Sequence, residues 1–249
     1  MLVIEQFRQA IQGAGLHPPD AIEADGVLHR FASSGKRGDD AGWYVFHDDT
    51  VSAGAFGDWR GGLWRTWRAD IGRSLSPQEE SAHRARIEAM RREREAEEIK
   101  RRADAREKAA LIWAEALPCA KHSYLARKGI AAHGARLSRD RLVLPIRDES
   151  GVLHSLQFID ADGGKKYLPA GRIRGCYFCI GKPAGVLCLA EGFATGASIH
   201  ESTGYAVAVA FDCGNLLPVA KALREKLPDI KIIVCADNDI QEVSNEHRN

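Results

Sequence analysis

Short runs of alternating hydrophobic and polar residues dominate residues 1–75, after an N-terminal segment with helical periodicity. Runs such as GWYVFHDD and VSAGAFGDW are typical of β-strands with one buried face, and a turn-forming stretch, SSGKRGDD, precedes them. We therefore predict a small N-terminal domain, rich in β-strands, that follows one helix.

A long polar segment occupies residues 76–118, and its few apolar residues do not keep a heptad spacing. Its start carries helix signals, because Ser76 can cap, Pro77 fits the first helical position and Glu79 stands three residues after the cap. Opposite charges one turn apart favour a solvated helix, and no strong breaker occurs before Pro118. We predict a long charged helix that acts as a spacer; a basic helix lying along DNA is the alternative.

The remaining chain divides into two patterns. In residues 119–185, a short helical segment, SYLARKGI, precedes LVLPIRD and GVLHSLQFID, which predict a hairpin in a small basic α+β subdomain. In residues 186–249, the buried-type strands GVLCLA, YAVAVAF and IKIIVCA alternate with helical segments, which predicts a parallel sheet. The predicted fold class is therefore α/β: a parallel sheet with flanking helices, preceded by the small α+β subdomain, the long charged helix and the β-rich domain.

The composition is that of an ordinary globular protein. Hydrophobic residues make up 45% of the chain and charged residues 28%, a balance that argues against disorder. No apolar run reaches the roughly 18 residues that a membrane helix needs. Glu5 and Arg8 also interrupt the N-terminus where a signal peptide would be apolar. We expect a cytoplasmic protein that does not contact a membrane.

The net charge of +1 conceals a partition along the chain. Residues 119–185 hold 12 basic and 5 acidic side chains, whereas residues 186–249 hold 5 and 9. This arrangement suits a protein that grips a polyanion with one part and holds metal cations with the next. The basic surplus includes side chains on a glycine-containing path that could follow a phosphate backbone; solubility is the alternative role. The candidates for nucleic-acid or nucleotide binding are Arg147, Lys165, Lys166, Arg172 and Arg174.

Two further motifs leave their roles open. The stretch FGDWRGGLWRTWR interleaves tryptophans with arginines, a combination that can stack bases and neutralise phosphates, or can form the core of a small domain. The stretch CYFC is a single pair of cysteines, whereas a structural zinc site needs four ligands. No zinc is expected, and the six cysteines are expected to be reduced.

Carboxylates follow the predicted strands of residues 186–249. Glu191 comes directly after the first strand, and Asp237 and Asp239 come after the third. Because the carboxyl ends of parallel strands share one edge of a sheet, we expect these side chains to converge. Convergent carboxylates repel one another unless a hard cation binds, most often Mg²⁺. Asp212, after the second strand, is a possible additional acid, although the role of helix cap or turn, shared with Asn215, is favoured for it.

At these residues the chain resembles a known family. The chain contains the segment LCLAEGFATGASI and, further on, the segment VCADND, whose Asp-x-Asp motif begins 46 residues after the glutamate of the first segment. These two segments resemble the Toprim domain of topoisomerases and bacterial-type DNA primases. The similarity is nearest to Toprim primases carried by plasmids, phages and integrated elements, and LVLPIRDESGVLHSLQFID and KKYLPAG resemble the basic subdomain of such a primase core.

The resemblance implies synthesis of RNA primers on single-stranded DNA from ribonucleoside triphosphates, with two divalent ions, Mg²⁺ or Mn²⁺. A replicative helicase is the implied partner. By the same resemblance Glu191 is the catalytic acid, Asp237 and Asp239 are metal ligands, and Lys166 contacts nucleotide or template.

The chain also departs from the family. Bacterial-type primases usually begin with a zinc ribbon, whereas residues 1–118 contain no cysteine. Thr195 stands where many members carry a further acid, and the chain ends at Asn249, before a second acidic pair and another strand and helix. We therefore expect a C-terminally incomplete Toprim domain. Two alternatives stay open: an inactive nucleic-acid-binding module, and a Toprim nuclease that uses the same acids.

Overall fold

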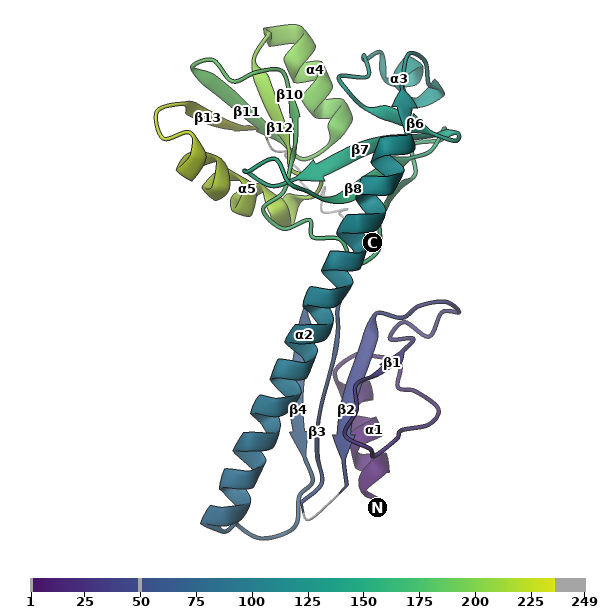
Figure 1. The fold of residues 1–249 in the computed structure, drawn as a ribbon, viewed down its shortest axis with the longest axis vertical. Helices are drawn as coiled ribbons and strands as arrows, with labels where there is room; N and C mark the ends of the chain where they lie inside the picture. Colours follow the sequence, from purple (N-terminus) through teal and green to yellow (C-terminus); the bar gives the residue numbers. More distant parts are fainter. Residues whose placement is uncertain (1, 49–50, 236–249) are drawn as a thin grey trace, which may run out of the picture. The chain divides into compact units, whose positions relative to one another are not determined.

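The computed structural model describes residues 2–48 and 51–235 of the chain. It divides into two compact units, Met1–Lys100 and Arg101–Asn249 (Figure 1). Helix α2, Pro77–Glu115, contributes its first part to the N-terminal unit and its last turns to the C-terminal unit. Among the described residues, no helix is both long and apolar enough to cross a membrane.

Four antiparallel strands form the sheet of the N-terminal unit in the order β1-β2-β3-β4. Successive side chains of a strand point to opposite faces, so the two faces of β2 have different partners. On one face, Tyr44 and Phe46 pack against Phe7 of the amphipathic helix α1. On the other face, Trp43 and Val45 belong to a cluster with the α2 residue Met90. The elements are α1 Val3–Gly13, β1 His29–Phe31, β2 Gly42–His47, β3 Ala53–Asp58 and β4 Leu63–Arg68.

Two of the interleaved tryptophans, Trp59 and Trp67, serve the packing of this unit. The rings of Trp67 and Phe7 lie 5.2 Å apart, so Trp67 belongs to the core on the α1 face. The guanidinium of Arg94, on α2, lies 5.8 Å from the ring of Trp59 and 5.9 Å from that of Trp64. These contacts support the core interpretation for Trp59 and Trp67, whereas Trp64 keeps 36% of its surface exposed.

The start of α2 confirms the predicted capping signals. The Ser76 N–H donates to Glu79 Oε2 at 2.8 Å, and the Glu79 N–H donates to Ser76 Oγ at 3.3 Å. Each residue thereby satisfies a backbone donor that the first turn of a helix leaves unpaired. The long charged helix predicted from residues 76–118 is confirmed as a 39-residue helix.

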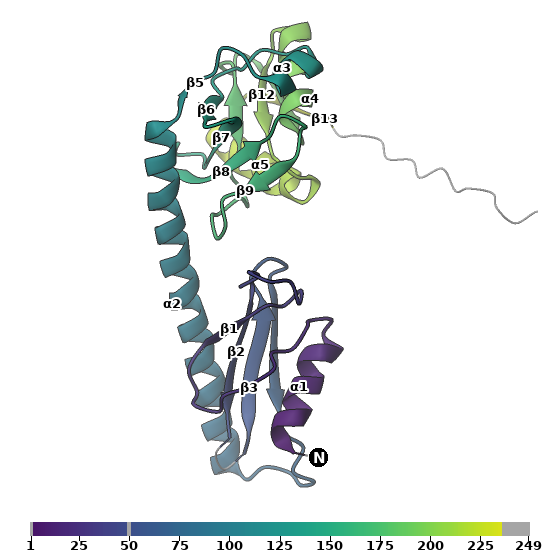
Figure 2. The same ribbon diagram turned by 90° about the vertical axis from the view of Figure 1, so that its right-hand side faces the viewer.

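In the C-terminal unit, five antiparallel strands form a sheet in the order β5-β6-β7-β8-β9 (Figure 2). The predicted hairpin is confirmed as the antiparallel pair β7 and β8, which runs from Leu142 opposite Ile159 to Arg147 opposite Leu153. Helix α3 ends at Gly129, whose φ of +65° is the left-handed conformation that closes many helices. The elements are β5 Leu117–Pro118, α3 Ser123–Lys128, β6 Arg136–Ser138, β7 Arg141–Arg147, β8 Leu153–Ile159 and β9 Lys165–Tyr167.

A second sheet of the same unit has four strands in the order β10-β12-β11-β13. Strand β11 runs parallel to both β12 and β13, as the alternation of strands and helices predicted. The CYFCI segment adds an antiparallel strand, β10, which was not expected from its sequence pattern. The elements are β10 Phe178–Ile180, β11 Val186–Ala190, α4 Phe193–Thr203, β12 Ala206–Val209, α5 Cys213–Lys226 and β13 Lys231–Cys235.

Helices α4 and α5 pack on opposite faces of this sheet. Phe193 and Ala197 of α4 join Val207 and Val209 in the largest core cluster, which also holds Leu144 of the five-stranded sheet. Helix α5 packs through Val219 and Leu223 against Leu187, Leu189 and the alanines of β12. The mixed α/β class is therefore confirmed, and the main core lies where the two sheets of the unit meet.

Candidate active site

The ends of β11 and β12 are tied together at one edge of the sheet. The Ala210 N–H donates to Ala190 O, and the Phe211 N–H donates to Glu191 O, both at 2.8 Å. Phe211 has a φ of +75°, in the left-handed region that residues other than glycine rarely adopt. Backbone strain of this kind is found mainly at functional sites, because it persists only where surrounding contacts fix it. The half-buried Glu191 is therefore held next to the turn that leads into α5.

Asp212 stands in that turn, at the N-cap position of α5. Its φ of −151° is extended, as a cap requires, but its side chain makes no capping hydrogen bond. Asp212 thus occupies the cap position that the sequence favoured for it, but it does not make the side-chain hydrogen bond of a cap. The carboxylate of Asp212 thus stays available at the edge that carries Glu191.

Asn215 has a different role from the turn or cap expected for it. Its side chain is only 3% exposed, and its Oδ1 accepts from the Gly175 N–H at 2.8 Å. Its Nδ2 donates to the carbonyls of Ile173, Cys176 and Ala210 at 2.8–3.1 Å. The first turn of α5 is thereby fastened to the loop that precedes β10.

Strand β9 brings a phenol and an ammonium group to the same edge. The Tyr167 hydroxyl donates to Phe211 O at 3.0 Å and so holds the strained residue. Burial raises the pKa of Tyr167, and the negative charges of Asp212 and Glu191 raise it further. A Cβ added at Gly192 would lie 3.7 Å from Lys165 Nζ, so this ammonium group lies beside the turn after Glu191. Sequence reasoning missed Tyr167, although its spacing from Lys165 places both on one face of a strand.

The other predicted basic residues lie elsewhere. Lys166 alternates with Lys165 and Tyr167 and so points to the opposite face of β9. Arg147 donates to Gly151 O at 2.9 Å and lies 6.0 Å from the ring of Trp113; burial lowers its pKa. Arg172 and Arg174 line a cavity together with residues of the middle turns of α5. Asp237 and Asp239 are outside the described residues.

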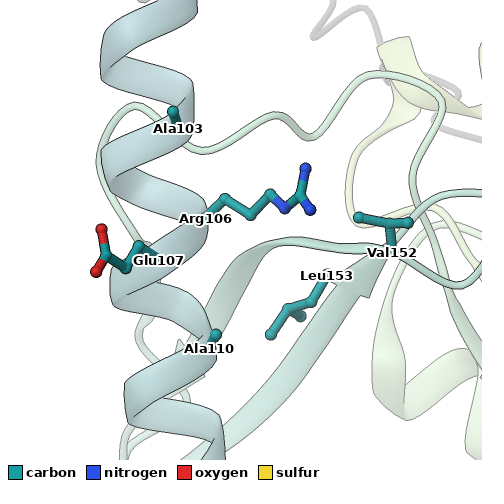
Figure 3. Close-up of a pocket in the computed structure, with 6 residues that line it drawn as sticks. All are labelled: Ala103, Arg106, Glu107, Ala110, Val152 and Leu153. Atoms are coloured by element: carbon teal, nitrogen blue, oxygen red, sulfur yellow. The ribbon is translucent and has the colours of Figure 1, made fainter.

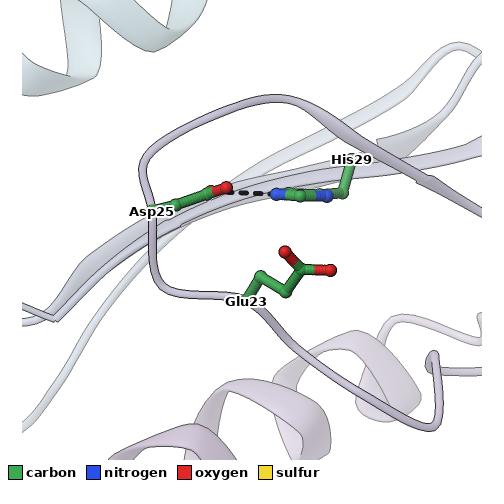
Figure 4. A group of neighbouring side chains, drawn as sticks. All are labelled: Glu23, Asp25 and His29. Carbon is green, nitrogen blue, oxygen red and sulfur yellow. Dashed lines mark hydrogen bonds and ion pairs between the residues drawn. The ribbon is translucent and has the colours of Figure 1, made fainter.

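Two other features of the described chain do not belong to this edge. A cavity of about 330 Å³ lies between α2 and the β7–β8 turn and is lined mainly by aliphatic groups, with Arg106 and Glu107 at its side (Figure 3). In the N-terminal unit, Glu23, Asp25 and His29 lie together (Figure 4). The Val27 N–H and the His29 ring lower the pKa of Asp25. Asp25 is hydrogen-bonded to the Val27 N–H and to the His29 ring, and this group is not the carboxylate cluster predicted from the sequence.

The comparisons with known proteins find a domain family and two relatives. The Toprim domain family matches residues 185–241. Two curated proteins of Escherichia coli, both named DNA primase TraC, are 31% and 32% identical to the chain over 95% and 94% of its length. The chain spans 24% and 17% of their own lengths.

A solved structure of the bacteriophage T7 lagging-strand DNA polymerase interacting with primase domains of two gp4 subunits is also similar. It is 20% identical, with 47% of this chain and 61% of that chain covered, and the TM-score is 0.30. The resemblance drawn from the sequence is confirmed by the domain match and by the two relatives.

Proposed function

Because the chain carries a Toprim domain and is related along nearly its whole length to part of DNA primase TraC, we propose that it synthesises short RNA primers on single-stranded DNA. The reaction is nucleotidyl transfer from ribonucleoside triphosphates. The observation that carries the proposal is the meeting of Glu191, Asp212 and Lys165 at one sheet edge, where acids and a cation serve phosphoryl chemistry.

The residues at this edge fit a divalent cation. Glu191 and Asp212 offer carboxylate oxygens, the donors that Mg²⁺ and Mn²⁺ prefer, and the Asp212 side chain is not used as a helix cap. We assign Asp237 and Asp239, which follow β13 in the sequence, to the same ligand set. When bound, the metal would offset negative charge on the phosphate oxygens.

The side chains of the chain itself supply the other parts of the mechanism. Glu191 acts as the general base that accepts the proton of the attacking hydroxyl, or as a further metal ligand. Lys165 offers positive charge to the triphosphate, and Tyr167 holds the backbone between Glu191 and Asp212 in place. Lys166, Arg147, Arg172 and Arg174 contribute to the grip on template or nucleotide, in keeping with the basic surplus of residues 119–185.

The proposal also includes the boundaries of four domains and a protein partner. We assign residues 1–75 to a β-rich domain, 76–118 to a helical linker, 119–185 to the basic primase subdomain and 186–249 to the Toprim domain. The partner is a replicative helicase, and the setting is the replication of a plasmid, phage or other mobile element.

Primer synthesis is tested with single-stranded DNA, labelled ribonucleotides and Mg²⁺ or Mn²⁺. The wild-type chain should give short RNA products, and Glu191→Gln and Asp237→Asn should each lose them. Asp229→Asn is the matched control, because Asp229 is an exposed acid outside the site. DNA binding without products would favour the inactive binding module, and metal-dependent loss of the DNA would favour the nuclease.

A further inference from the structure

A basic cavity of about 440 Å³ lies in the C-terminal unit, away from the carboxylate edge. It is bordered by the loop before β10, by the middle of α5, by the β7–β8 turn and by α2. Four cationic side chains and two acidic ones line it, so its lining carries a net positive charge. These side chains are Arg102, Arg172, Arg174, Lys221, Glu149 and Glu225.

Buried hydrogen bonds fix the wall that carries two of the arginines. Asn215 ties Ile173, Gly175 and Cys176 to α5, so the loop cannot shift without breaking bonds in the protein interior. The same helix carries Lys221 at the opposite wall. The cationic groups are therefore mounted on one rigid frame, as a preformed binding site requires.

Arg172 is also held in place by its own loop. Its Nε donates to Arg174 O at 3.0 Å, and its Nη2 lies 3.4 Å from the position of a Cβ on Gly175. Gly175 has a φ of +75°, so a side chain there would be strained and would also contact the guanidinium. The glycine thus lets the guanidinium lie against the loop with its outer nitrogens available.

Two of the cationic side chains in the cavity, Arg174 and Lys221, have no partner among the described residues. Neither side chain makes a hydrogen bond or ion pair within this part of the chain, although two carboxylates border the same cavity. Both side chains are exposed, so an anion reaches them without displacing a protein partner. Arginine and lysine together recognise phosphate by forked hydrogen bonds and by point charge.

The cavity is also separate from the carboxylate edge. Lys221 lies nine residues after Asp212 along α5, a rise of about 13 Å at 1.5 Å per residue. A phosphate held by Lys221 therefore lies away from the edge that carries Glu191, although the wall that carries Arg174 is tied to Asn215 in the first turn of α5.

We propose that this cavity is a second phosphate-binding site, which holds a phosphate group at a distance from the carboxylate edge. The group is carried by the polyphosphate of a free nucleotide or by the backbone of single-stranded DNA, since both present the same oxygens. The inference deepens the role proposed above for Arg172 and Arg174 and in that respect rests on the proposed function. It concerns binding alone, so its failure is distinguishable from a failure of primer synthesis at the carboxylate edge.

The test is a binding titration of the full chain in EDTA, so that no metal-dependent binding at the carboxylate edge contributes. The probes are inorganic tripolyphosphate, followed by calorimetry, and a fluorescent oligothymidylate, followed by anisotropy. Arg174→Gln and Lys221→Gln should each weaken binding about 5- to 10-fold, the loss of one charge-assisted contact. Glu225→Gln should tighten it about 2-fold, because it removes a repulsive charge from the lining.

Matched controls separate a site from a general charge effect. Lys182→Gln and Asp229→Asn change the same charges at exposed positions outside the cavity and should leave affinity within about 1.5-fold. Weakening of tripolyphosphate binding assigns the cavity to a free polyphosphate, and weakening of oligonucleotide binding alone assigns it to the DNA backbone. Equal shifts in the cavity and control variants, or no shift for either probe, would overturn the proposal.

Discussion

Replacement of Asn215 by leucine should unfasten the loop that carries Arg172 and Arg174. The change removes the acceptor of the Gly175 N–H and the donors for the carbonyls of Ile173, Cys176 and Ala210, at a position that is only 3% exposed. An amide group has two hydrogens, so three carbonyls share two donors. Each buried group left without a partner costs about 1–3 kcal/mol, and with partial relaxation we expect a loss of about 3–5 kcal/mol.

Chemical denaturation followed by circular dichroism measures this loss, and hydrogen exchange localises it. The melting temperature should fall by roughly 10 °C. The Gly175 amide should exchange much faster in Asn215→Leu, whereas the Gly151 amide, bonded to Asp148 O at 2.9 Å, should be unchanged. Asn215→Asp should be at least as harmful, because a carboxylate would face three carbonyl oxygens. A loss below about 1 kcal/mol with Gly175 still protected would refute the role of Asn215.

Three further predictions follow from single contacts. Tyr167→Phe removes the hydroxyl that donates to Phe211 O at 3.0 Å; stability should fall by about 1 kcal/mol, and the rate constant of primer synthesis about 10-fold with little change in nucleotide KM. Burial raises the pKa of Cys176 to about 11, so at pH 8 a thiol reagent should label the exposed Cys213 and spare Cys176 in the native protein. A hydrogen bond from the Ala131 N–H and a weaker effect of His133 lower the pKa of Glu201 below its usual 4.5. The ionised carboxylate therefore stabilises the folded state above pH 4.5, and this contribution should disappear as the pH falls further. Glu201→Gln should remove that part of the pH dependence of the free energy of unfolding.

The sequence predicted the elements of the site better than the contacts between them. Strand periodicity and the shared edge of parallel strands placed Glu191 and Asp212 together, because both rules depend on local pattern alone. The contact between Tyr167 and Phe211 joins two sheets across 44 positions, and no local pattern encodes it. The face of β9 that meets the edge is likewise set by pairing with β8, where Tyr167 lies opposite Gln157.

Two misread residues show where short-range rules fail. The two cysteines of CYFC raise the question of a metal site in the sequence, whereas Phe178–Ile180, with alternating buried and exposed side chains, forms the edge strand β10. Asn215 was read as a cap or turn residue because such amides favour helix starts, but tertiary contacts turn it into a buried anchor.

The most direct test of the proposed active site compares two neighbouring lysines of identical chemistry on opposite faces of β9. Primer synthesis is measured at saturating template for Lys165→Gln and Lys166→Gln. The account predicts a rate loss of about 100-fold for Lys165→Gln, whose ammonium lies beside the Glu191 turn, and less than about 3-fold for Lys166→Gln. Equal losses, or a larger loss for Lys166→Gln, would contradict the assignment of this sheet edge as the site of nucleotidyl transfer.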